Sequence, residues 1–168
     1  MRVHLYFVGL TLVGLVLLLA PLGELWELVF QNETYSHIIL IPAVSLVLVA
    51  VRRKSIMEGA AAGGKPAIGL SVGASGLCLY VAAVLLREDL GRQALLAHDI
   101  PNDYLSLCMA AAVVWAIGSF IAAYGTSAFR RARFEILLLI FTIPIPMFLL
   151  NVIVAALQHA SAEVAAVV

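Results

Sequence analysis

Three groups of side chains in this sequence have the chemistry to bind or react, and all lie within or beside long apolar stretches. The first is His37, which follows Tyr35 and Ser36 and begins an apolar run that ends at Val51. A histidine at a helix end near water titrates close to neutral pH, so it can serve as an acid, a base or a hydrogen-bond donor. The alternative is that His37 only caps and anchors the end of its helix.

The second group is the two cysteines, Cys78 and Cys108, which both lie in apolar runs. Their spacing is that of neither a metal site nor a disulfide scaffold. Cys108 lies about one helical turn inside its apolar stretch, at the depth expected for His37, so the two could act as nucleophile and base. For Cys108 we prefer the alternative, in which it is a small buried apolar residue. Cys78 lies mid-span, where we expect no reaction with an aqueous partner.

The third group lies in the last apolar stretch and comprises Asn151, Gln158 and His159. An amide inside a membrane span commonly joins helices through hydrogen bonds, which is the simplest interpretation of Asn151. We also predict that these three residues and His37 gather at the outer end of a helical bundle and form its polar site. The sequence has no glycine-rich phosphate loop and no metal-spaced set of ligands, so we expect neither a cofactor nor a metal.

The composition indicates whether water or lipid surrounds the protein that carries these residues. Hydrophobic residues make up 64% of the 168 and charged residues only 12%. Soluble domains are roughly 45–50% apolar, and a chain of this size cannot bury such an excess in one core. The formal net charge is zero, which disfavours a nucleic-acid binder because such a protein needs a basic surface. The composition therefore predicts an integral membrane protein.

Five apolar stretches are long enough, or nearly so, to cross a bilayer, which takes ~20 residues of helix. They cover residues 3–22, 35–51, 67–86, 104–124 and 134–157. Lipid offers no partner to backbone polar groups, so each span must be helical. We therefore predict one all-α transmembrane bundle over residues 1–168. Pro144 and Pro146 should kink its fifth helix.

The charges predict the orientation of this bundle. Eight of the ten basic residues fall on one side of the predicted topology and eight of the ten acidic residues on the other. The positive-inside rule then places the N-terminus in the cytoplasm and the C-terminus outside. Arg52 and Arg53 close the second span as anchors on the cytoplasmic side. Glu135 should pair with a neighbouring arginine.

Two further features concern the joints of the bundle. The connection over residues 55–65 is rich in glycine and alanine, which is typical of a flexible linker. Short connections predict that the first span lies beside the second and the fourth beside the fifth. Small residues suit close helix contacts, and those expected to make them are Gly69, Gly73, Gly76, Ala110, Ala111 and Ala112.

Several short motifs occur in a particular order along the chain. The second span opens with Tyr35-Ser36-His37-Ile38-Ile39-Leu40-Ile41-Pro42 and ends in Arg52-Arg53, and an arginine-containing loop and Phe141-Thr142-Ile143-Pro144-Ile145-Pro146 follow later. The last motif is Leu157-Gln158-His159-Ala160-Ser161-Ala162-Glu163-Val164-Ala165. Together these motifs resemble the N-terminal half of the exosortase/archaeosortase family, from about residue 26 onward. Ile38 departs from the family pattern, in which many members have glycine.

This resemblance implies a cysteine transpeptidase of the bacterial inner membrane that cleaves C-terminal sorting signals of the PEP-CTERM kind by thiolate attack. The family's nucleophile lies in an A-C-S-G-like segment and its essential arginine in a later span. Neither segment occurs here, and neither Cys78 nor Cys108 matches, so no catalytic residue is assigned. The leading hypothesis is a truncated exosortase, inactive alone.

Two other hypotheses remain open. One is a non-catalytic envelope protein that binds or scaffolds partners, and the other is a small enzyme that uses Cys108 and His37. The expected partners are membrane lipid and either a sorting-signal peptide or a missing C-terminal half. Nucleic acid is not among them.

Overall fold

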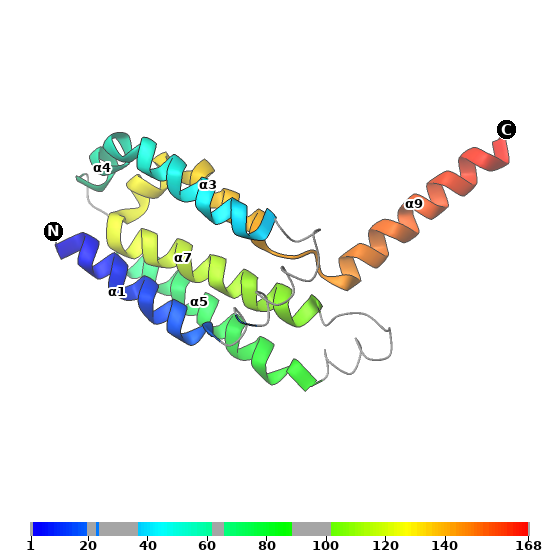
Figure 1. The fold of residues 1–168 in the computed structure, drawn as a ribbon, viewed down its shortest axis with the longest axis horizontal. Coiled ribbons are helices and arrows are strands. Elements are labelled where there is room, and N and C mark those ends of the chain that lie inside the picture. The colour runs from blue at the N-terminus through cyan, green and yellow to red at the C-terminus, as the bar shows by residue number, and fades with distance from the viewer. Residues whose placement is uncertain (1, 20–22, 24–36, 62–65, 89–101, 168) are drawn as a thin grey trace.

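The computed structural model describes residues 2–19, 23, 37–61, 66–88 and 102–167, and its elements are all helical. They are α1 (Arg2–Leu17), α3 (His37–Val51), α4 (Arg53–Ala61), α5 (Pro66–Leu85), α7 (Asn102–Arg131), α8 (Arg133–Leu137), the 3-10 helix η2 (Leu138–Thr142) and α9 (Met147–Val167). Figure 1 shows their arrangement. The prediction of an all-α fold is confirmed for the residues that the structure describes.

Two of the described helices are long and apolar enough to cross a bilayer, namely α5 and the part of α7 over Asp103–Arg131. Shorter apolar helices cover Val3–Leu17, Leu40–Val51 and Leu149–Val164. The number of spans, their orientation and the single-domain organisation stay predictions. The predicted ends of the first span at Leu22 and of the second at Tyr35 lie outside the described residues.

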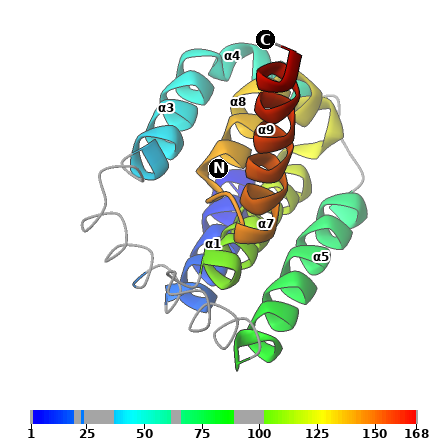
Figure 2. The same cartoon turned by 90° about the vertical axis from the view of Figure 1, so that its right-hand side faces the viewer.

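Helix α7 is the centre of the bundle, and α1, α4 and α5 all pack against it (Figures 1 and 2). Its contact with α5 depends on glycine. A Cβ atom added at Gly69 would lie 2.1 Å from the backbone nitrogen of Ala122, and one added at Gly118 would lie 2.3 Å from that of Gly73. No side chain fits at Gly69 or Gly118, so the predicted role of Gly69 in close helix packing is confirmed, and Gly73 supplies the backbone that Gly118 meets.

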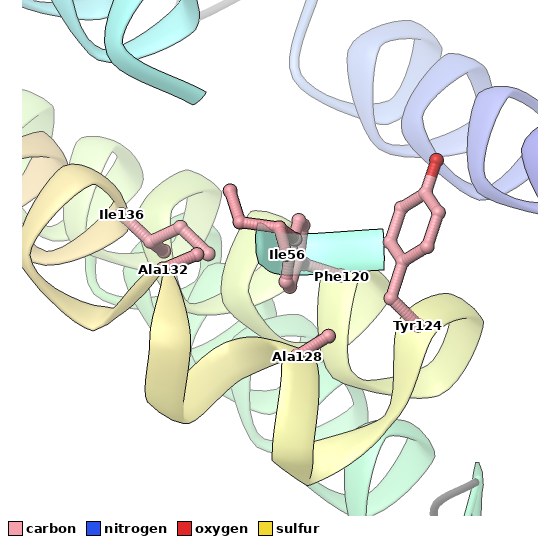
Figure 3. Packing of buried hydrophobic residues seen from close by; sticks show 6 residues of the cluster. All are labelled: Ile56, Phe120, Tyr124, Ala128, Ala132 and Ile136. Atoms are coloured by element: carbon pink, nitrogen blue, oxygen red, sulfur yellow. The ribbon is translucent and has the colours of Figure 1, made fainter. Parts of the chain in front are cut away.

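Over residues 55–61 the connection after α3 is helical and not the flexible linker that its glycine content predicts, while residues 62–65 lie outside the described part of the chain. Residues Arg53–Ala61 form α4, and Ile56 is 1% exposed. A Cβ atom on Gly59 would lie 3.0 Å from the backbone of Ala128, so α4 sits directly on α7. Figure 3 shows the apolar cluster that results, which comprises Ile56, Phe120, Tyr124, Ala128, Ala132 and Ile136.

The chain reverses direction near the end of α7. Gly125 has φ 86° and ψ 165°, a backbone conformation open mainly to glycine, and α7 bends there. Helices α8 and η2 then run back beside α3, as the yellow and orange ribbons show in Figure 1. The first two apolar stretches, predicted to be neighbours, instead pack mainly on different partners. Helix α1 lies on α7, whereas α3 lies on η2 and α8.

The fifth apolar stretch is not one kinked helix over residues 134–157, as predicted, but two helical segments with a break between them. Ile143 has φ −74° and ψ 119°, which is extended backbone, and α9 begins only at Met147. Proline lacks an amide donor and forces the preceding residue out of the helical region, so Pro144 and Pro146 together stop the helix. Helix α9 then leads away from the bundle, toward the end opposite the N-terminus (Figure 1).

Candidate functional site

The predicted outer-face polar site is divided between α3 and α9. His37 is the first residue of α3, but its side chain lies outside the described residues, as do Tyr35 and Ser36. Asn151 and Gln158 both lie on α9 and are exposed. His159, also on α9, is exposed too. These three residues are therefore not enclosed in a pocket, and their gathering with His37 stays a prediction.

Two polar residues of α9, Asn151 and Gln158, nevertheless share one face of the helix. Asn151 and Gln158 are seven residues apart, which is almost two full turns, so their side chains leave the helix in nearly the same direction. Ala155 and Ala162 continue the same stripe at helical spacing, and all four residues are exposed. His159 is turned by about 100° from this stripe. The four residues form a polar and small-residue face, which we call the Asn151–Gln158 face.

The break before α9 is held against the first turn of α7. Pro144 is fully buried, and the Oγ of Ser106 donates a hydrogen bond of 2.8 Å to its carbonyl oxygen. The carbonyl of Pro146 accepts bonds from the amides of Leu149 and Leu150, which begin α9. Carbonyls released by a break inside a membrane need such partners. The two motif prolines therefore fix the place where α9 starts.

The cysteines are poorly placed for chemistry. Cys108 is 1% exposed, in a cluster with Ala83, Tyr104, Leu105 and Met109. A nucleophilic thiolate must reach a substrate carbonyl, and this packing gives Cys108 no such access. The geometry favours its interpretation as a small buried apolar residue. Cys78 is exposed on α5, and neither cysteine forms a disulfide.

Within the described part of the chain, no three or more His, Cys, Asp or Glu side chains are grouped so that they could hold a metal ion.

An ion pair joins α3 to α8 at the opposite end of the bundle. Arg52 donates from Nη1 to Oε1 of Glu135 at 2.5 Å, and the Glu135 side chain is only 2% exposed. Ser45 donates from Oγ to the backbone carbonyl of Glu135 at 2.6 Å. Glu135 pairs with an arginine as predicted, but the partner is Arg52, 83 positions away, and not a neighbour in the sequence. This motif arginine thus has a structural contact in addition to its charge.

A cavity of about 690 Å³ lies beside this ion pair, between α1, α3, α4 and α7. Pro42, inside α3, and Arg53, at the start of α4, both line it. At one end the Nδ1 of His4 lies 2.8 Å from the hydroxyl of Tyr124, so the two share a hydrogen bond. No local pattern in the sequence predicts this cavity, because its walls include segments more than a hundred residues apart.

Comparison with known proteins gives one finding. A family model described as transmembrane exosortase matches residues 26–168, which is most of the chain and includes every motif from Tyr35 to Ala165. Neither the curated proteins nor the solved structures contain a match.

Proposed function

Because the chain belongs to the transmembrane exosortase family, we propose that it supplies the N-terminal helices of an enzyme that processes C-terminal sorting signals of the PEP-CTERM kind. The proposed place of action is the outer face of the bacterial inner membrane, with five spans, a cytoplasmic N-terminus and an external C-terminus. The order of the histidine motif, Arg52-Arg53 and the Pro144–Pro146 motif within the matched region supports this proposal.

The proposed chemistry is thiolate attack on a peptide carbonyl, which needs an accessible and activated cysteine. The sequence contains no A-C-S-G-like segment, and Cys108 is buried. We therefore assign the nucleophile to residues outside these 168, in a segment or partner that completes the enzyme. Alone, the described helices would not cleave a sorting signal.

The observation that carries this proposal is the exposed helix α9. It leaves the bundle at the motif prolines, and its apolar side chains from Leu149 to Val164 are exposed. The Asn151–Gln158 face offers two amides and two alanines, the residue types that let membrane helices approach and hydrogen-bond. We propose that this face docks the nucleophile-bearing helices of the enzyme.

Co-purification tests this docking. The tagged chain is expressed with the C-terminal half of an intact exosortase, which carries the A-C-S-G-like segment. We expect the two to purify together, and the double variant Asn151→Leu/Gln158→Leu to reduce recovery of the partner several-fold. His159→Leu is the matched control, since it lies on α9 off that face and should change nothing. Equal recovery with all three chains would refute docking through this face.

A non-catalytic envelope scaffold is the second candidate function. The exposure of α9 favours it too, because an uncovered membrane helix can receive any partner helix. This function predicts that the tagged chain, purified from its own membrane, carries a partner without an A-C-S-G-like segment. The exosortase proposal predicts a partner that has one.

A further inference from the structure

The cavity between α1 and α3 has the size and shape of a ligand site. Its volume is about 690 Å³, within the range of roughly 300–1,000 Å³ typical of sites for small organic ligands. We call it the α1–α3 cavity. It lies away from α9, so an inference from it is independent of the function proposed above.

The lining of this cavity changes from cationic to apolar along its length. His4, Arg53 and Tyr124 lie at the end formed by the start of α1, the start of α4 and the half of α7 that is predicted to be cytoplasmic. Pro42 lies nine residues before Val51, the last residue of α3, and nine helical residues span ~14 Å. The wall therefore extends ~14 Å from the end that carries Arg53 to Pro42. The deeper wall is largely apolar and includes Phe7, Leu46, Val49, Phe120 and Leu139.

The charge at the mouth of the cavity is available. Arg52 is occupied by Glu135, but Arg53 makes no ion pair or hydrogen bond with any residue that the structure describes. The hydroxyl of Tyr124 shares a hydrogen bond with Nδ1 of His4, which leaves Nε2 of that ring for another partner. The α1–α3 cavity therefore presents a guanidinium and an imidazole nitrogen above an apolar slot.

We propose that the α1–α3 cavity binds one acyl chain of an anionic phospholipid, with the lipid phosphate at Arg53. The polarity of the cavity runs in the same direction as that of a phospholipid, from a charged head at the membrane surface to a hydrocarbon tail. A guanidinium suits phosphate because it donates two parallel hydrogen bonds. Basic pockets between membrane helices on the cytoplasmic side recognise anionic headgroups in this way.

Other occupants fit the cavity less well. An apolar helix would cover the wall but leave the guanidinium without a partner. A soluble phosphate would use Arg53 but leave the apolar wall bare. A neutral hydrocarbon would use the wall but leave the guanidinium without a partner. Only an anionic amphiphile uses both.

Lipid titration followed by native mass spectrometry of the whole chain in detergent tests the proposal. The probes are phosphatidylglycerol, phosphatidylcholine and the soluble glycerol phosphate. We expect one phosphatidylglycerol to bind more tightly than phosphatidylcholine, and glycerol phosphate not to compete with it. Equal binding of the two lipids, or displacement by glycerol phosphate, would overturn the proposal.

Two pairs of variants separate the charge from the wall. Arg53→Gln should weaken phosphatidylglycerol about fivefold, the effect of one basic residue near anionic lipid. Lys54→Gln makes the same charge change one residue later, off the lining, and should leave affinity unchanged. Ala50→Trp fills the cavity and should weaken lipid binding, whereas Val47→Trp, on α3 but outside the lining, should not. An equal loss of lipid affinity in both variants of either pair would contradict the assignment of the lipid to the α1–α3 cavity.

A labelling measurement on the unaltered chain does not depend on variant folding. Phosphatidylglycerol with a photoreactive diazirine near the end of one acyl chain should label the deep wall, around Pro42 and Leu139. Labelling confined to exposed faces of α5, or spread evenly over all helices, would overturn the proposal.

Discussion

At the scale of single residues, the buried carboxylate of Glu135 is the most demanding group in the bundle. A carboxylate without a partner is strongly unfavourable in an apolar environment. Removing one member of a buried ion pair leaves the charge of the other member uncompensated. Arg52 compensates Oε1, while Oε2 has no hydrogen-bond partner among the described residues. The two residues of the motif pair Arg52-Arg53 therefore have different roles. Arg52 pairs with Glu135 of α8, and Arg53 lines the α1–α3 cavity.

Removing the Arg52 side chain should destabilise the bundle. We expect Arg52→Gln to lower the free energy of unfolding by about 1.5–3 kcal/mol, the contribution of a hydrogen bond to a charged group. The double variant with Glu135→Gln should recover part of that loss, because the buried charge is gone. Arg53→Gln is the control and should change stability by less than about 0.5 kcal/mol. Thermal unfolding in detergent measures all three, and equal losses for Arg52→Gln and Arg53→Gln would contradict this account.

At the scale of elements, most connections between helices were predictable from the sequence, but two were predicted incorrectly. The glycines of residues 55–65 suggested a linker, yet Ile56, Met57 and Ala60 pack together on one side of a helix. The glycine content of this segment obscured the helical spacing of its apolar residues. Pro144 and Pro146 gave the right place for a change of direction, but a full break depends on Ser106 of α7, which no local pattern connects to them.

The contact between α5 and α7 was predictable because small residues are visible in a sequence. We expect Gly118→Ala to cost about 1–3 kcal/mol of stability, since its Cβ would overlap the backbone of Gly73. Gly9→Ala, on α1, is the matched control. An added Cβ there meets nothing within 4 Å, so the gain in helix propensity should stabilise the chain by about 0.5–1 kcal/mol. The predicted result is a lower unfolding midpoint for Gly118→Ala, and a higher one for Gly9→Ala, than for the unaltered chain.

At the scale of the whole molecule, the fold class and the family were predictable from periodicity, composition and motif order. The α1–α3 cavity was not, because its lining joins His4 to Tyr124 across the chain. Nor does the structure gather Asn151, Gln158 and His159 into a pocket, because the broken fifth stretch carries them away from the bundle. Such long-range relations depend on tertiary packing, which local patterns do not encode.

The membrane orientation that the loop charges predict can be measured directly. We expect fusions of green fluorescent protein at the N-terminus and after Ala61 to fluoresce, because both points are predicted to be cytoplasmic. Alkaline phosphatase fused after Val167 should be active, because it folds only outside the cytoplasm. An active phosphatase fusion after Ala61 would reverse the predicted orientation.

The most direct test of the proposed function is the C-terminal mass of a secreted reporter that carries a PEP-CTERM sorting signal. It is measured in cells that lack their own exosortase and express this chain, the nucleophile-bearing half of an intact exosortase, or both. We predict a shortened reporter only when both are present, and none when the nucleophilic cysteine of the added half is replaced by serine. A reporter shortened by this chain alone would contradict the account, because the chain would then carry its own nucleophile.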